Sequence, residues 1–206
     1  MIKSAKFVKS CPTIEHISDI PELPQIAFVG RSNVGKSSLL NMLVNQKKLA
    51  VTSQTPGRTR LINFFEVKFS REKGVDEDIH FVDLPGYGFA AASKSMKYGW
   101  GENITEYLVK SQQLELVFIL LDIRHLPSEL DLAMLHFLQS HGIPFSILAT
   151  KVDKISRSES LNLRRKLANS IGVGERDIIM TSSKGTQGRV EVFARIQIAI
   201  NTEAAE

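Results

Sequence analysis

Residues 26–40 read IAFVGRSNVGKSSLL, an apolar run that leads into a glycine-rich turn and then into a helical pattern. The centre of this stretch is a G-x-x-x-x-G-K-S motif from Gly30 to Ser37. Its glycines let backbone N–H groups wrap around phosphate oxygens, Lys36 reaches the terminal phosphates, and the Ser37 hydroxyl is a ligand for Mg²⁺. The motif, placed between a strand and a helix, predicts a phosphate site at a helix N-terminus.

Strand-like and helical patterns alternate along the chain on both sides of this loop. Apolar strand-like runs cover residues 26–30, 61–69, 79–83, 116–122, 144–150 and 177–181. Helical spacing covers residues 37–44, 128–141 and 189–200, and Ser156 with Glu159 forms a capping-box signature that opens another helix. The alternation predicts an α/β fold with a mostly parallel sheet and helices on both faces. In such sheets, ligands bind beyond the carboxyl ends of the strands.

Length and composition indicate one globular domain. The 206 residues, 43% hydrophobic and 23% charged, exclude a disordered chain. We expect an extended lead-in at residues 1–23, one domain at 24–200 and a short tail at 201–206. No apolar run approaches the roughly 20 residues that cross a bilayer, and the single Cys11 permits no internal disulfide. The expectation is a soluble, cytoplasmic protein without a membrane partner.

Positive charge is concentrated in two segments of a chain whose net charge is +4. Residues 31–65 contain six cations and no acid, and residues 154–176 contain six cations against two acids. Segregated charge of this kind is typical of a protein with a polyanionic ligand or partner. For Arg164, Arg165 and Lys166, an ordinary solvated helix face is an equally good interpretation.

Two further motifs follow strands. Asp83, Leu84, Pro85 and Gly86 form D-x-x-G, in which the acid can support a Mg²⁺ shell and the glycine N–H can meet a terminal phosphate. Residues 150–153 read TKVD. The carboxylate of this motif can accept two hydrogen bonds from guanine, which adenine does not offer, and the lysine stem can pack on the purine. The usual first residue is asparagine; Thr150 keeps a hydroxyl and loses the amide.

The loop of residues 52–65, TSQTPGRTRLINFF, lies between the first helix and the second strand. A threonine here would bind Mg²⁺ and a γ-phosphate only in the triphosphate state. Thr59 is the first choice because it lies just before the strand, and Thr55 is the competitor. A flexible surface loop is compatible with this role, because a switch segment has to move.

Together these motifs resemble the EngB (YihA/YsxC) family of ribosome-associated P-loop GTPases, within the translation-factor class and its TrmE-Era-EngA-EngB-Septin-like branch. The stretches that carry the resemblance are GRSNVGKSS, TSQTPGRTRLINFF, FVDLPGYGFA, TKVDK and TSS, and it covers about residues 20–200. It implies a Ras-like G domain, a P-loop NTPase fold, that binds GTP with Mg²⁺ and hydrolyses it to GDP and phosphate. It also implies association with the ribosome, support of large-subunit assembly, and a need for the protein in cell division and septation.

The resemblance also implies a set of site residues. Lys36, Thr59 and Gly86 would act on the reacting phosphate, and Ser37 and Thr59 would ligate Mg²⁺ with Asp83 behind them. The expected GTP contacts are Gly30, Arg31, Ser32, Asn33, Val34, Gly35, Lys36, Ser37, Ser38, Gly57, Arg58, Thr59, Asp83, Leu84, Pro85, Gly86, Thr150, Lys151, Val152, Asp153, Thr181, Ser182 and Ser183.

Hydrolysis is expected to be slow, because Tyr87 stands where many small GTPases have a water-orienting glutamine. The missing help would come from a partner or from K⁺ bound near Asn33, where related potassium-activated GTPases place a ligand. Alternatively, Asn33 only closes the loop by hydrogen bonding. Lys94, Lys97, Tyr98 and Trp100 would suit RNA contacts, although Trp100 is also a good candidate to anchor the following helix in the core.

Two functions remain in competition on the sequence. The first is a GTP-hydrolysing assembly factor whose partners are the RNA and proteins of the large ribosomal subunit. The second is a protein-only regulatory switch in cell division without RNA contact. The two basic segments favour the first. Neither interpretation involves DNA, and both are expected of a monomer.

Overall fold

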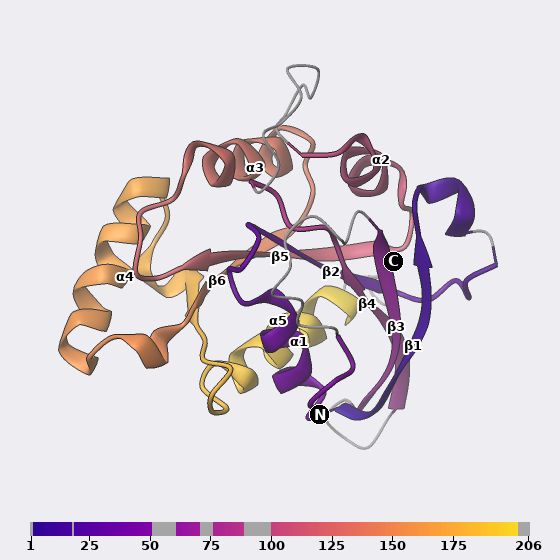
Figure 1. Ribbon diagram of the computed structural model, residues 1–206, viewed down its shortest axis with the longest axis horizontal. Helices are drawn as coiled ribbons and strands as arrows, with labels where there is room; N and C mark the ends of the chain where they lie inside the picture. Colours follow the sequence, from indigo (N-terminus) through magenta and orange to yellow (C-terminus); the bar gives the residue numbers. More distant parts are fainter. Residues whose placement is uncertain (1, 18, 51–60, 71–75, 89–99, 202–206) are drawn as a thin grey trace.

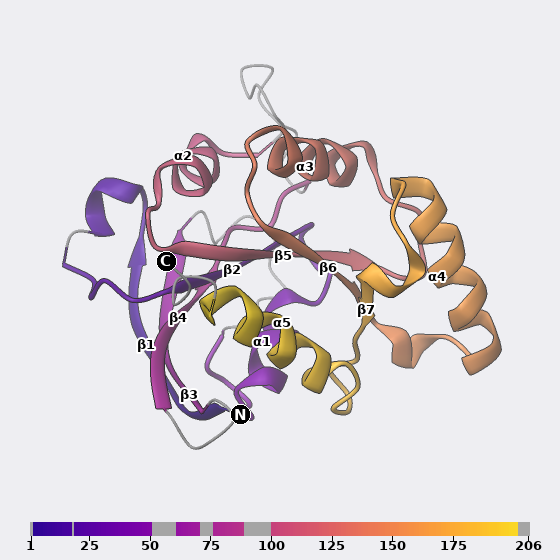
Figure 2. The ribbon, with the colours of Figure 1, turned by 180° about the vertical axis from the view of Figure 1, so that it is seen from behind.

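The computed structural model describes residues 2–17, 19–50, 61–70, 76–88 and 100–201 (Figure 1). Its strands are β1 (Ile2–Cys11), β2 (Gln25–Gly30), β3 (Ile62–Ser70), β4 (Asp76–Asp83), β5 (Leu114–Asp122), β6 (Phe145–Thr150) and β7 (Ile178–Met180). They form one sheet in the order β1-β3-β4-β2-β5-β6-β7, seen from behind in Figure 2. The run from β4 to β7 is parallel, and β3 is antiparallel to both β4 and β1. The prediction of a mostly parallel α/β sheet is therefore confirmed.

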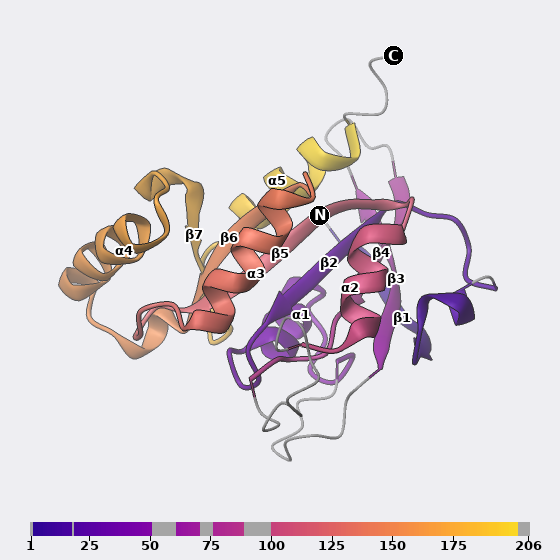
Figure 3. The ribbon, with the colours of Figure 1, turned by 90° about the horizontal axis from the view of Figure 1, so that it is seen from above.

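Helices cover both faces of the sheet, as predicted. They are α1 (Lys36–Leu43), α2 (Glu102–Lys110), α3 (Glu129–Ser140), α4 (Arg157–Ile171) and α5 (Arg189–Asn201). One hydrophobic cluster joins the sheet to α2, α3 and α4, and a second joins its other face to α1 and α5. Figure 3 shows α2 and α3 lying across one face, with α4 beyond the β7 edge. Among the helices of the described residues, none has the length and apolar character needed to traverse a bilayer.

The amino terminus is part of the sheet, which differs from the lead-in expected for residues 1–23. β1 is extended, but it pairs with β3 along its length, and Cys11 at its end is fully buried. The sequence hides this strand because it lies at an edge and exposes lysines such as Lys3 and Lys6. Charged residues on an edge strand prevent pairing with other chains, and they also weaken the apolar alternation that identifies a strand.

The helix expected after Trp100 is α2, whose bounds the sequence analysis did not give, and Trp100 explains its position. Trp100 is 4% exposed and packs edge-on against Phe137 of α3, with 5.7 Å between ring centroids. Within α2, the Tyr107 hydroxyl donates to the side-chain oxygen Oε1 of Gln25, at the start of β2, at 2.8 Å. The interpretation of Trp100 as a core anchor for the following helix is thus confirmed.

His80 is a buried ionisable residue in the middle of the sheet. It lies on β4 between β2 and β3, is 0% exposed, and meets the Phe64 ring edge-on at 6.1 Å. Neither ring nitrogen has a hydrogen-bond partner among the described residues. Burial lowers the pKa of His80 below its usual value, although the nearby Glu66 carboxylate opposes the shift. The folded protein therefore holds a neutral imidazole, whereas the unfolded chain takes up a proton near pH 6.5.

We expect His80 to make the protein less stable in acid. Its contribution is fully present above about pH 6.5 and is lost as the pH falls from there toward the lowered pKa, because only the unfolded chain binds the proton. His80→Leu should flatten the pH dependence of the free energy of unfolding by up to about 1.4 kcal/mol per pH unit in that window. Urea unfolding at pH 7.5, 6.5 and 5.5 measures this, and equal slopes for both proteins would contradict it.

Candidate nucleotide-binding site

The predicted site segments follow neighbouring strands of the sheet. The loop of residues 30–37 comes after β2, Asp83 ends β4, and Lys151 and Thr181 follow β6 and β7. Because these strands are parallel, their carboxyl ends meet at one edge. The fold therefore brings four of the five predicted motifs together.

The remaining predicted residues lie outside the part of the chain that the structure describes. They are Thr55, Gly57, Arg58 and Thr59 of the first loop, and Lys94, Lys97 and Tyr98 of the second.

The glycine-rich loop ends at the N-terminus of α1. Gly35 precedes the helix with φ +109°, in the left-handed region that favours glycine. No side chain caps this helix end, and Lys36, Ser37 and Ser38 form its first turn. The free N–H groups of that turn and the positive end of the helix dipole favour an anion at this point.

Lys36 and Asp83 form an ion pair at the mouth of this loop. Their side chains are only 11% and 9% exposed. Each charge stabilises the other, because burying either charge without a partner would cost several kcal/mol of free energy. The pair joins the first turn of α1 to the end of β4, and it places a cation and a carboxylate oxygen at the same point.

The D-x-x-G segment lies directly against the loop. The Ser32 N–H donates to Tyr87 O at 2.9 Å, and the Tyr87 N–H donates to Gly30 O at 3.3 Å. A Cβ on Gly86 would lie 3.1 Å from the Ser32 backbone, so a side chain here would push the two segments apart. Leu84 and Pro85 are buried beneath, while Gly86 itself is exposed.

The Tyr87 side chain is directed into the protein. It is 3% exposed, and its hydroxyl donates to Asp131 Oδ1 in the first turn of α3 at 2.9 Å. Burial, together with the Asp131 carboxylate, raises the pKa of Tyr87 well above its ordinary value, so the hydroxyl stays a donor. A hydroxyl committed to α3 does not orient a water molecule at the loop.

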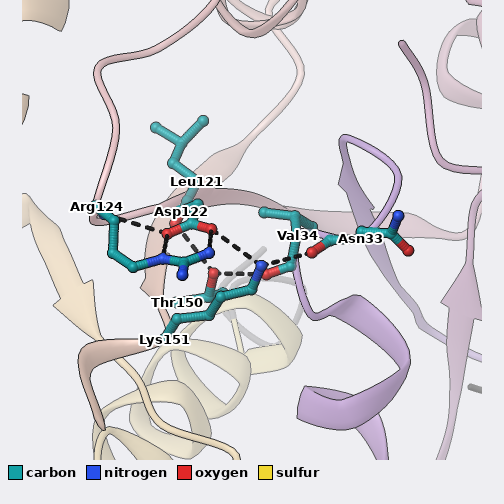
Figure 4. A network of polar contacts seen from close by, with 7 residues as sticks. All are labelled: Asn33, Val34, Leu121, Asp122, Arg124, Thr150 and Lys151. Carbon is teal, nitrogen blue, oxygen red and sulfur yellow. Dashed lines mark hydrogen bonds and ion pairs between the residues drawn. The ribbon is translucent and has the colours of Figure 1, made fainter. Parts of the chain in front are cut away.

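Thr150 connects the TKVD motif to the phosphate loop. Its hydroxyl donates to Val34 O at 2.7 Å, with Leu121 O at 3.2 Å as a second acceptor within reach (Figure 4). Thr150 is 4% exposed. A hydroxyl is therefore sufficient to tie β6 to the loop, which explains how the motif dispenses with the usual asparagine amide.

Lys151 makes a second connection to the same loop. Its backbone is left-handed, with φ 62°, and its Nζ donates to Asn33 O at 2.6 Å. The ammonium also forms an ion pair with Asp122 Oδ2 at 3.0 Å. Asp122 in turn accepts hydrogen bonds from the Arg124 side chain at 2.9 and 2.7 Å, as Figure 4 shows.

Asp122 and Arg124 were not among the predicted site residues. A signal for Asp122 was present, because it ends an apolar strand just as Asp83 does. Although burial opposes it, hydrogen bonds from Arg124 and Lys151 hold the pKa of Asp122 well below its usual range. The carboxylate is therefore ionised at neutral pH.

Asp153 and the segment after β7 lie together. The Ser182 hydroxyl donates to Asp153 Oδ1 at 2.9 Å, and the Val152 N–H donates to Thr181 O at 3.3 Å. Thr181 and Ser182 are buried, and Ser183 is exposed at the start of the turn. Lys184 Nζ lies 3.9 Å from Asp153 Oδ2, and a carboxylate with these two partners keeps lone pairs for a ligand.

Comparisons with known proteins agree with this geometry. A family model described as "50S ribosome-binding GTPase" matches residues 25–151. The probable GTP-binding protein EngB of Desulfatibacillum aliphaticivorans is 43% identical over 196 residues, which are 95% of this chain and 91% of that protein. The probable GTP-binding protein EngB of Geotalea daltonii is 42% identical over 205 residues, 100% of this chain and 95% of that protein.

A solved structure of Era in complex with MgGDPNP and a segment of 16S ribosomal RNA shares the fold. Its TM-score is 0.66 at 23% identity, and the match covers 85% of this chain and 56% of that one. The EngB relatives, by contrast, match nearly from end to end, and the family model spans more than half of the chain. With its phosphate loop, D-x-x-G and TKVD segments gathered at one edge of the sheet, this chain is a P-loop GTPase and belongs to the EngB family of GTP-binding proteins.

Proposed function

We propose that this protein binds GTP at the edge of the sheet described above, hydrolyses it slowly to GDP and phosphate, and uses the two states to assist assembly of the large ribosomal subunit. Normal cell division and septation depend on this activity, which takes place in the cytoplasm. The buried Lys36–Asp83 pair is the observation that carries the nucleotide part. The pair holds a cation and a carboxylate at one point. On nucleotide binding, the phosphates would replace Asp83 as the partner of Lys36, and the metal ion would replace Lys36 as the partner of Asp83.

In the nucleotide complex, Lys36 leaves Asp83 and binds the β- and γ-phosphates. The first turn of α1, with Ser37 and Ser38, donates N–H groups to the same phosphates. Gly86 lies against Ser32, and its N–H would donate to the γ-phosphate. Asp83, released from the lysine, becomes available to the metal ion.

Mg²⁺ fits the oxygen atoms at this point. The Ser37 hydroxyl is a hard ligand of the kind that Mg²⁺ binds, and the Asp83 carboxylate would support the ion from behind, through water bound to it. Among the described residues no group of three His, Cys, Asp or Glu side chains could hold a metal ion, which suits an ion that takes its other ligands from phosphate and water. When bound, Mg²⁺ neutralises charge on the β- and γ-phosphates. Thr59 would complete the set in the triphosphate state.

The guanine base is read at the other end of the site. Asp153 accepts hydrogen bonds from the base, while the Ser182 hydroxyl fixes the carboxylate. The stem of Lys151 packs on the purine plane. Backbone N–H groups from Thr181 to Ser183 meet the guanine carbonyl oxygen.

Slow hydrolysis follows from the position of Tyr87. Its hydroxyl is bonded to Asp131, so another group has to orient the attacking water. In the described residues the Asn33 side-chain amide makes no hydrogen bond, and the backbone carbonyl of Asn33 accepts from Lys151 instead. The amide is therefore available for K⁺, and a group from the partner is the other source of acceleration.

The ribosomal partner is supported by the family description and by the surface charge. Lys154, Arg157, Lys166 and Arg176 are exposed on and beside α4 and form no ion pair within the described residues. Such cations can displace counterions from RNA phosphates. A protein-only switch in cell division, without RNA, is the competing function, and ribosome binding decides between the two.

The identity of the base that the protein binds should depend on Asp153. We expect Asp153→Asn to weaken GTP binding about 100-fold, since a charged acceptor pair is lost, and to gain binding of xanthosine triphosphate, whose extra carbonyl complements the asparagine amide. Titration calorimetry with GTP, xanthosine triphosphate and ATP measures this. Wild-type protein that binds ATP as tightly as GTP would rule out the guanine assignment.

Substitution of Lys36 and of Ser37 should distinguish the contribution of the lysine charge from that of the metal ion. Lys36→Ala should weaken GDP·Mg²⁺ about 100-fold, because a charged hydrogen bond to phosphate is lost. Ser37→Ala should raise the Mg²⁺ concentration needed for half-maximal nucleotide binding. Binding titrations across a Mg²⁺ series test both, and unchanged affinity in both variants would contradict the phosphate site.

Subunit binding should depend on the nucleotide, on salt and on α4. Pelleting with large ribosomal subunits should be stronger with a non-hydrolysable GTP analogue than with GDP, and weaker as salt rises. The quadruple variant K154Q/R157Q/K166Q/R176Q should bind less and show a shallower salt dependence. The control K3Q/K6Q/K9Q/K68Q removes four cations that are already ion-paired near β1.

Three outcomes of the same experiment would count against the assembly role. Equal pelleting in both nucleotide states would show that the nucleotide state does not control binding to the partner. An absence of pelleting would favour the protein-only switch. GTP turnover that is already fast without subunits or K⁺ would show that a catalytic group has been overlooked.

A further inference from the structure

We propose that Asp122 and Arg124 are positioning residues for the nucleotide. They hold the ammonium group of Lys151 in a fixed position. The lysine stem can then pack against the purine ring, and the ammonium group can stabilise the phosphate loop. This inference rests on the proposed placement of guanine beside Asp153. It assigns a task to a carboxylate and a guanidinium that neither the phosphate motif nor the TKVD motif contains.

The tip of Lys151 is held from two sides. Its Nζ lies 3.0 Å from Asp122 Oδ2 and 2.6 Å from Asn33 O (Figure 4). An unrestrained lysine populates many rotamers, and it would have to lose that freedom when a base packs on its stem. A lysine anchored at its tip has lost most of this freedom before the nucleotide arrives.

Arg124 fixes the orientation of the Asp122 carboxylate. Its Nε and Nη2 donate to the two carboxylate oxygens at 2.9 and 2.7 Å, and its backbone N–H donates to Oδ1 at 3.2 Å. A guanidinium that binds both oxygens sets the plane of the carboxylate as well as its position. Oδ2 is thereby turned toward Lys151, and the Asp122 side chain is only 14% exposed.

The same network reaches the phosphate end of the site. Lys151 and Thr150 bind the carbonyls of the consecutive residues Asn33 and Val34. Asn33 has φ 64°, a left-handed conformation that a hydrogen bond to its carbonyl helps to hold. Asp122 therefore supports the loop conformation in which backbone N–H groups face the phosphates.

This task differs from base recognition, and the difference can be measured. Asp153 binds the edge of guanine, where inosine lacks the 2-amino group. The Lys151 stem contacts the face of the ring, which guanine and hypoxanthine share. Loss of Asp122 should therefore weaken GDP and IDP by the same factor, whereas loss of Asp153 should change the ratio between them.

The experiment measures GDP and IDP affinity by calorimetry and GDP dissociation with a fluorescent N-methylanthraniloyl derivative. Asp122→Asn keeps the size of the side chain and removes its charge. We expect about tenfold weaker binding of both nucleotides, the effect of one charge-assisted hydrogen bond, expressed mainly as faster dissociation, with an unchanged GDP-to-IDP ratio. Arg124→Gln leaves the carboxylate in place and should produce a smaller loss of the same kind.

A double-mutant cycle shows whether Asp122 acts through Lys151. Lys151→Met keeps an unbranched stem and removes the ammonium, so in this background Asp122→Asn should cost nothing further. The control Glu175→Gln removes the carboxylate from another arginine pair, with Arg165, and should leave nucleotide affinity unchanged. Thermal unfolding of every variant separates loss of binding from loss of fold.

The outcomes distinguish this inference from the function on which it rests. If Asp153→Asn changes the GDP-to-IDP ratio while Asp122→Asn and Arg124→Gln leave affinity unchanged, the positioning role is overturned and the guanine site stands. Additive losses in the double mutant, or an Asp122→Asn effect that differs between GDP and IDP, would also overturn it. If Asp153→Asn leaves the ratio unchanged, the placement of the base is wrong and both conclusions fall.

Discussion

The parallel run of strands from β4 to β7 is the constraint on which this protein depends. Parallel strands point their carboxyl ends to the same edge, so residues far apart in the chain arrive at one place without any loop having to be long. Gly30, Asp83, Asp122 and Thr150 each stand at the end of such a strand. Helices packed on both faces bury the sheet and hold this edge in a fixed geometry.

At that edge, hydrogen bonds connect the TKVD motif to the glycine-rich loop. The carbonyls of Asn33 and Val34 accept hydrogen bonds from Lys151 and Thr150, so the glycine-rich loop is supported by the TKVD motif. In the proposed nucleotide complex, contacts at the base end would therefore stabilise the loop conformation required at the phosphate end.

A buried ion pair lies at the centre of the proposed nucleotide site. Lys36 and Asp83 satisfy one another in a nearly dry environment, and in the proposed complex the nucleotide and its metal ion would supply replacement partners for both. Tyr87 lies at the junction, since its backbone pairs with the phosphate loop and its hydroxyl binds Asp131 of α3. Tyr87 thereby connects the D-x-x-G segment to α3 on the surface of the domain.

The local motifs could be predicted from the sequence because their chemistry depends on residues that are neighbours in the chain. The G-x-x-x-x-G-K-S loop, the TKVD motif and the Ser156–Glu159 capping box all belong to this group, and the capping box is present at α4. β1, the bounds of α2 and the role of Asp122 with Arg124 escaped prediction. An edge strand is defined by the partner it pairs with, the position of α2 by the packing of Trp100, and the role of Asp122 by a lysine 29 residues away. Such contacts exist only once distant segments have met, and no periodicity within either segment records them.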